Sequence, residues 1–120
     1  MFRRFDAKVV VLLLAAGAAP AQAQEMDEVV AAAKNQLGLL EYCQAEGHIE
    51  ARAVEVQQQM FARLPAPGNP AKAEAAYQKG RSGTVSAMGV EQSLRDASAS
   101  QNSEVAALCR QMAALVTQSG

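Results

Sequence analysis

Apolar side chains recur at spacings of three and four residues in two neighbouring parts of the chain, which is the period of an amphipathic helix. The first part, residues 25–46, carries them at Val29, Val30, Ala33, Leu37, Leu40 and Cys43. The second part carries them at Ile49, Ala53, Val56, Met60, Phe61 and Leu64. Gly47 predicts a tight corner between the two helices, because glycine readily adopts the left-handed conformation that ends a helix. Gly38, inside the first helix, indicates a close approach by another helix.

The helical period stops in a proline-rich loop and is weak beyond it. Residues 65–70 read PAPGNP, and a helix cannot run through this set of prolines and glycine. Pro70 suits the first turn of the next helix, which we expect over residues 71–79. The following segment, residues 80–89, is rich in small residues and has no strong period. We therefore expect a turn there.

Two further helices are expected in the last third of the chain. Val90, Leu94 and Ala97 are spaced by four and three residues, which predicts a short helix over residues 90–100. Asn102 or Ser103 is placed to cap a last helix. The apolar stripe of that helix is the clearest in the chain: Val105, Leu108, Cys109, Met112, Leu115 and Val116. Together these patterns predict an all-α fold, a small bundle of four to five helices.

The amino terminus has the three parts of a secretory signal peptide. Residues 1–8 are basic, residues 9–19 are apolar, and the small-x-small sequence Ala21-Gln22-Ala23 follows. Cleavage after Ala23 would leave residues 24–120 as a single helical domain in the periplasm. The apolar run is shorter than the roughly twenty residues that span a bilayer. The alternative is that residues 9–19 form the buried end of a long first helix.

Export bears directly on Cys43 and Cys109, the two cysteines of the chain. In an oxidising compartment an even number of cysteines favours pairing, so we expect one disulfide between them. Such a bond closes a long loop and stabilises the fold by about 4 kcal/mol on the chain-entropy model. A Cys43 thiolate nucleophile activated by His48 is the competing interpretation, and oxidation would remove it.

The charge balance argues against nucleic acid as a partner. The chain has 11 basic and 12 acidic residues, and loss of residues 1–23 removes Arg3, Arg4, Lys8 and Asp6. Eight basic and eleven acidic residues remain, which gives a net charge of −3. Without a basic face the protein cannot neutralise phosphates or dock electrostatically on anionic lipid.

Four further residues are candidates for an interaction or turn role: His48, Arg81, Gly83 and Met88. His48 is the only histidine, and without other suitable ligands it makes a poor metal site. Gly83 lies in a glycine-rich segment that lacks the lysine of a phosphate-binding loop, which favours a turn. The methionines are better placed to pack than to bind copper. We therefore expect no cofactor, no metal and no catalytic residue.

Three segments carry a resemblance that covers almost all of residues 24–120. They are NQLGLLEYCQAEGHIEARAVEVQ, KGRSGTVSAMGVEQSL and VAALCRQM, together with the proline loop. They resemble a family of small exported proteins of alphaproteobacteria, which are labelled as pore-forming relatives of the early secreted antigenic target family. The resemblance implies an exported protein that acts on membranes by forming pores. It implies no catalytic residues.

The sequence thus predicts a non-catalytic periplasmic protein that acts through its surface. We expect it to bind a protein of the cell envelope or to associate with itself. An alternative is a membrane-active, pore-forming protein that inserts the helices of residues 49–64 and 105–116. A small ligand held between helices is a third hypothesis.

Overall fold

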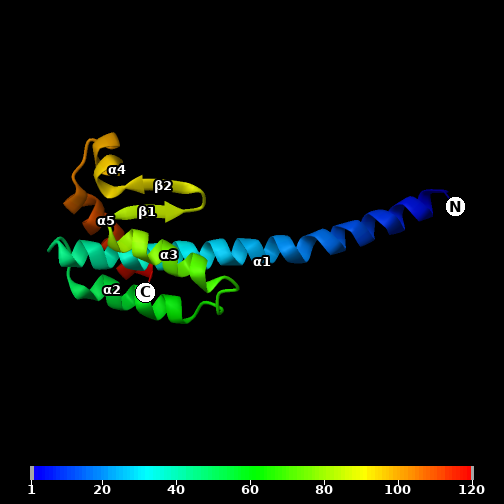
Figure 1. Cartoon of the computed structure of the whole chain (residues 1–120), viewed down its shortest axis with the longest axis horizontal. Coiled ribbons are helices and arrows are strands. Elements are labelled where there is room, and N and C mark those ends of the chain that lie inside the picture. Colours follow the sequence, from blue (N-terminus) through cyan, green and yellow to red (C-terminus); the bar gives the residue numbers. More distant parts are fainter. Residues whose placement is uncertain (1, 120) are drawn as a thin grey trace.

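The computed structural model describes residues 2–119, and the side chains from residue 22 onward. Within these residues the chain forms five helices and one two-stranded sheet. The helices are α1 (Phe2–Ala45), α2 (Ala51–Ala62), α3 (Pro70–Arg81), α4 (Leu94–Ser100) and α5 (Val105–Ser119). The strands are β1 (Thr84–Ala87) and β2 (Val90–Ser93). The predicted small helical bundle is confirmed, with an added hairpin (Figure 1).

Helix α1 is the axis of the molecule. Its amino-terminal part projects away from the other elements, so the longest dimension reaches 69 Å against 31 and 27 Å for the others (Figure 1). The helix was expected to begin at Glu25 but begins at Phe2, because apolar and alanine-rich residues favour the same conformation ahead of it. The expected cleavage after Ala23 would shorten α1 to the part that packs, and it stays a prediction.

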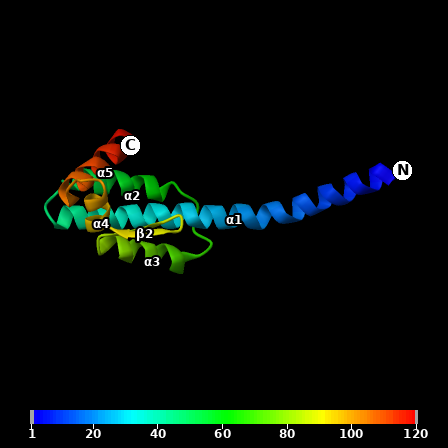
Figure 2. The same cartoon turned by 90° about the horizontal axis from the view of Figure 1, so that it is seen from above.

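Helices α2 and α3 lie on opposite sides of α1 (Figure 2). The crossing of α1 and α3 is close because Gly38 meets Gly80. A Cβ atom on Gly38 would overlap the Tyr77 carbonyl oxygen, and one on Gly80 would overlap the Asn35 carbonyl oxygen. The close packing predicted at Gly38 is therefore confirmed, and both positions exclude any side chain.

Two apolar clusters form the core around α1. One lies mainly between α1, α2 and α5 and contains Leu37, Leu40, Ala53, Val54, Val56 and Val116. The other lies between α1, α4 and α5 and contains Leu39, Cys43, Leu94, Leu108 and Cys109. Cys43 and Cys109 are bonded to each other, with their Cα atoms 5.6 Å apart and no exposed surface. The expected disulfide is thus present, and it attaches the last helix to the first.

The corner after α1 also follows its prediction. Gly47 has a φ of 78°, and the backbone N–H of His48 donates to the Cys43 carbonyl oxygen at 2.9 Å. This is the glycine-ended pattern that closes a helix.

Three predictions beyond residue 79 are wrong. The segment of residues 80–89, expected to be a turn, contains strand β1 over Thr84–Ala87. Residues 90–93 form strand β2 rather than helix, because Val90 pairs with Ala87 across a tight turn. The short helix α4 begins only at Leu94, where the Ser93 hydroxyl accepts from the Asp96 N–H at 3.1 Å. Asn102 ends α4 in a left-handed conformation (φ 51°), so it closes the preceding helix instead of capping α5.

Candidate interaction site at the hairpin

A buried amide holds the hairpin on the body of the protein. The side chain of Asn35 on α1 is 1% exposed, and its Nδ2 donates to the Ala76 carbonyl oxygen at 2.8 Å and the Thr84 carbonyl oxygen at 3.0 Å. Its Oδ1 accepts from the backbone N–H of Ser86 at 3.0 Å. Asn35 therefore occupies the inner edge of β1 in the way that a neighbouring strand would.

The outer strand β2 has a different environment. Leu94 N–H donates to the Gly83 carbonyl oxygen at 2.8 Å, and the register pairs Val85 with Gln92. Hydrogen-bonded and non-hydrogen-bonded pairs alternate along an antiparallel ladder. The backbone groups of Glu91 and the N–H of Ser93 therefore point away from β1, whereas the carbonyl oxygen of Ser93, the N-cap residue, belongs to the first turn of α4. Residues 90–92 are exposed, so β2 forms an open edge along the outside of the molecule (Figure 1).

The tip of the hairpin combines an apolar side chain with an unusual backbone. Met88 and Gly89 connect the strands, with φ angles of 53° and 81°. Two positive φ angles match the twist of a two-residue hairpin, which favours asparagine, aspartate or glycine at both places. Methionine has no such preference, yet it holds this position with 60% of its surface exposed. Strained, exposed side chains of this kind are found at functional sites.

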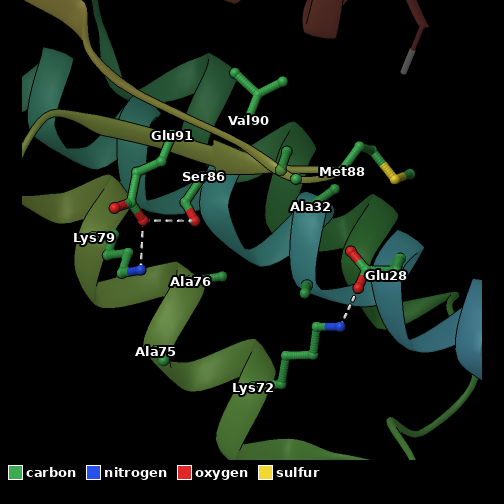
Figure 3. A pocket seen from close by; sticks show the side chains of 13 residues that line it. Glu28, Ala32, Lys72, Ala75, Ala76, Lys79, Ser86, Met88, Val90 and Glu91 are labelled. Carbon is green, nitrogen blue, oxygen red and sulfur yellow. Dashed lines mark hydrogen bonds and ion pairs between the residues drawn. The ribbon is translucent and has the colours of Figure 1, made fainter.

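A groove separates the hairpin from α3 (Figure 3). Its volume is about 440 Å³. Alanines from α1 and α3 form the floor, and the tip residue Met88 lies over Ala32 (Figure 3). Ion pairs stand at the two ends: Lys72 with Glu28, and Lys79 with Glu91. The groove is thus an open depression with an alanine floor and an ion pair at each end.

The Lys79–Glu91 pair connects the outer strand with α3. Lys79 Nζ lies 2.5 Å from Glu91 Oε1, and the Ser86 hydroxyl donates to the same oxygen at 3.4 Å. The hydrogen bond from Lys79, followed by its charge, lowers the pKa of the Glu91 carboxyl. Both side chains are about half exposed, so water and salt weaken this pair. The Lys79–Glu91 pair therefore helps to orient the hairpin but contributes little to its stability.

A second cluster joins side chains of α1, α2 and α3. Lys34 Nζ lies 4.7 Å from the centre of the Phe61 ring and 4.9 Å from that of Tyr77. The Tyr77 hydroxyl donates to Glu41 Oε1 at 2.6 Å, and this hydrogen bond raises the pKa of the hydroxyl. Aromatic rings attract cations on their faces. Because the Lys34 ammonium group already covers the Phe61 and Tyr77 rings, no cation from outside is needed there. This cluster helps to pack α1, α2 and α3 together.

The four candidates from the sequence fall into separate places. Met88 is at the hairpin tip, whereas Arg81 lies at the end of α3, with its Nε 3.6 Å from Glu41 Oε1. Gly83 has a φ of 84° and lies against the Tyr42 ring at the base of the hairpin. His48 is half-buried at the corner after α1 and lines a shallow hollow that also reaches Gly83. The structure therefore does not bring these four residues into one site.

Apart from Met88, the residues that build the hairpin site were missed in the sequence. Asn35 looked like one more polar residue on a helix, and nothing local indicates its pairing with β1. A signal for the hairpin itself was present in the Met88-Gly89 pair, since Val85 and Val90 lie near it on either side. Glycine at the second place of a two-residue turn is typical of hairpins.

Comparisons of the chain with family models, with curated proteins and with solved structures find no match. Among the described residues, no three histidine, cysteine or acidic side chains are grouped so as to hold a metal ion. No helix, over the residues searched, is both long and apolar enough to cross a membrane. Function must therefore be argued from the geometry of the chain itself.

Proposed function

We propose that the protein is a non-catalytic binding protein of the cell envelope that recognises a protein partner through the hairpin β1–β2. One observation carries this proposal. The inner edge of the hairpin is bonded to Asn35, whereas its outer edge and its tip face solvent. A rigidly supported strand with a free edge offers main-chain hydrogen bonds to an incoming protein. Met88 adds an apolar contact beside that edge.

Export to the periplasm is part of the same proposal. The basic, apolar and small-residue segments of residues 1–23 support it, and a disulfide between Cys43 and Cys109 is compatible with an oxidising compartment. Cleavage after Ala23 would leave the packed part of α1 intact, because the core side chains of this helix begin at Val30. The hairpin site would be unchanged.

Packing of the amphipathic helices supports binding rather than membrane insertion. Val54 and Val56 of α2 and Leu108 and Val116 of α5 are all buried in the core. Their insertion into lipid would require both helices to leave α1, and the disulfide restrains α5. A small-molecule site is less favoured. The groove has a volume of about 440 Å³, but the charged side chains at its two ends are already paired with each other.

Site-specific crosslinking in cells tests the proposal. A photoreactive amino acid is placed at Met88, and a matched variant carries it at Gln58, an exposed position on α2. We expect an adduct of defined mass from Met88 and none from Gln58 after illumination of cells that export the protein. Absence of an adduct from Met88, or equal labelling at both places, would contradict the proposal.

Two further measurements separate the parts of the proposal. Cell fractionation with sequencing of the amino terminus should place the protein in the periplasm, beginning at Gln24. A cytoplasmic protein that retains residues 1–23 would contradict export. Release of a trapped dye from lipid vesicles at low protein-to-lipid ratio would instead support the membrane-active alternative.

A further inference from the structure

Met88 combines high exposure with a backbone conformation that methionine rarely adopts. It has a φ of 53° at the tip of the hairpin, and 60% of its surface is exposed. Its thioether projects from the turn beside the groove (Figure 3). A leucine would offer a partner a similar apolar contact, and an asparagine would fit the turn better. What methionine adds at this place is a sulfur atom that can be oxidised.

The other methionines of residues 24–120 are less accessible. Met60 and Met112 are partly buried and pack against the apolar clusters of the core. Met26, on α1, is 41% exposed and does not line the groove beside the hairpin. An oxidant in solution reaches an exposed sulfur more readily than a packed one. Met88 is therefore the methionine that such an oxidant should reach first.

We propose that Met88 is a site of reversible oxidation to methionine sulfoxide, and that this modification weakens the binding of a protein partner at the hairpin. The co-reactant is a hydroperoxide such as hydrogen peroxide. The proposal rests on the proposed function and describes the regulation of the same site. Oxidation takes place in the unbound protein, because a bound partner covers the hairpin tip.

The reaction transfers one oxygen atom to sulfur. A lone pair of the Met88 sulfur attacks one oxygen of the peroxide, so that a sulfur–oxygen bond forms and the oxygen–oxygen bond breaks. The departing hydroxide takes the proton of the transferred oxygen and leaves as water. Sulfur loses two electrons, and the peroxide gains them. The side chain thus stays neutral and gains one oxygen atom.

The sulfoxide changes the hairpin tip from apolar to polar. Its oxygen accepts hydrogen bonds from water in the free protein, and a partner that covers Met88 has to displace this water. The lost hydration should weaken binding about tenfold or more. The new oxygen lies at the end of the side chain, so the pairing of Ala87 with Val90 should persist. Oxidation therefore alters the contact surface and leaves the fold of the hairpin in place.

Peptide mapping by mass spectrometry gives the first test. The exported protein is treated with hydrogen peroxide for increasing times, and the gain of one oxygen, about 16 Da, is followed at each methionine. We expect Met88 to react faster than the packed Met60 and Met112. Methionine sulfoxide reductases with a thiol reductant should then remove the oxygen from Met88. Equal rates at all three residues, or a Met88 sulfoxide that the reductases leave unchanged, would overturn the proposal.

Crosslinking in cells tests the effect on the partner. The photoreactive amino acid is moved to Val90, which is 57% exposed on the same hairpin, so that Met88 is retained. Brief treatment of the cells with hydrogen peroxide before illumination should remove most of the adduct. Peptide mapping of the same samples reports whether Met88 has been oxidised. An undiminished adduct in protein with oxidised Met88 would overturn the proposal.

Met88→Leu is the matched variant for this measurement. Leucine has a similar volume but no sulfur to oxidise. The yield of the Val90 adduct before treatment is the reference for this variant, and peroxide should not lower it. Met26→Leu removes a different exposed sulfur and should leave the sensitivity to peroxide unchanged. A peroxide-induced loss of the adduct in Met88→Leu would place the sensitive group elsewhere and overturn the role of Met88.

The outcomes also separate this proposal from the proposed function. A Val90 adduct that persists after Met88 is oxidised would overturn the regulation and leave the binding function standing. Absence of an adduct from both Val90 and Met88 in untreated cells would overturn the binding function, and the regulation with it.

Discussion

The crossing of α1 with α3 and the hairpin β1–β2 differ in how fully their groups are satisfied within the chain. At the crossing, Gly38 and Gly80 allow the backbones to touch, and no space is left for a side chain. At the hairpin, Met88 holds a strained conformation and exposes most of its surface. Asn35 belongs to both regions, since it bonds to α3 and to β1. The contrast indicates that the crossing provides stability, and it supports the proposal that the hairpin provides contact with a partner.

Removal of the disulfide should have the largest effect on the body of the protein. Cys43→Ala with Cys109→Ala opens a loop of 66 residues, so we expect the free energy of unfolding to fall by about 4 kcal/mol. Urea denaturation of the variant and of the original protein measures the difference. A loss below about 1 kcal/mol would contradict the view that the covalent link restrains the unfolded chain.

Substitution at the helix crossing should have the next largest effect. Gly38→Ala forces the backbones apart and should lower the free energy of unfolding by about 3 kcal/mol. Gly47→Ala is the matched control, because no atom lies near its Cβ position and only the positive φ is strained, at about 1 kcal/mol. Thermal unfolding compares the two variants, and equal losses would argue against a tight crossing.

Asn35→Ala tests the link between the two regions. It leaves the Ser86 N–H and two carbonyl oxygens without their partner, so we expect a loss of about 2 kcal/mol. Hydrogen exchange should quicken most at Ser86, whereas amides of α2 should follow only the global change. A uniform increase across the chain would show that Asn35 supports the whole core rather than the hairpin.

The smallest change in the free energy of unfolding is expected at the hairpin tip, and it should be a gain in stability rather than a loss. Methionine rarely adopts the left-handed conformation that Met88 has, whereas asparagine adopts it readily. Met88→Asn should therefore stabilise the hairpin by about 0.5–1 kcal/mol. Removal of the exposed apolar side chain should at the same time weaken association of the protein with its partner. Hydrogen exchange at Gln92, whose N–H bonds across the hairpin to Val85, and the affinity for the partner check the two effects, and a gain in both would contradict a binding role for Met88.

Prediction from the sequence succeeded where a local pattern determined the outcome. The stripe from Val105 to Val116 required a helix, Gly47 required its corner, and the pairing of Cys43 with Cys109 followed from their number. It failed at Val90, where spacing of four to Leu94 imitated a helix. A run of four residues is too short for its period to distinguish strand from helix. The Met88-Gly89 pair carried a signal for the hairpin, whereas the contact of Asn35 with β1 could be found only in the structure.

Spacing and residue type along the chain are enough to predict the helical class, the main helix positions and the identity of the bonded cysteines. The tertiary structure decided which side chains share a site. Asn35 and Ser86 are separated by 51 positions, and their contact arises from the packing of α1 against the hairpin. It also decided which edge of the hairpin is open, since the backbone groups of a strand are the same in every sequence and only neighbours determine whether they are bonded.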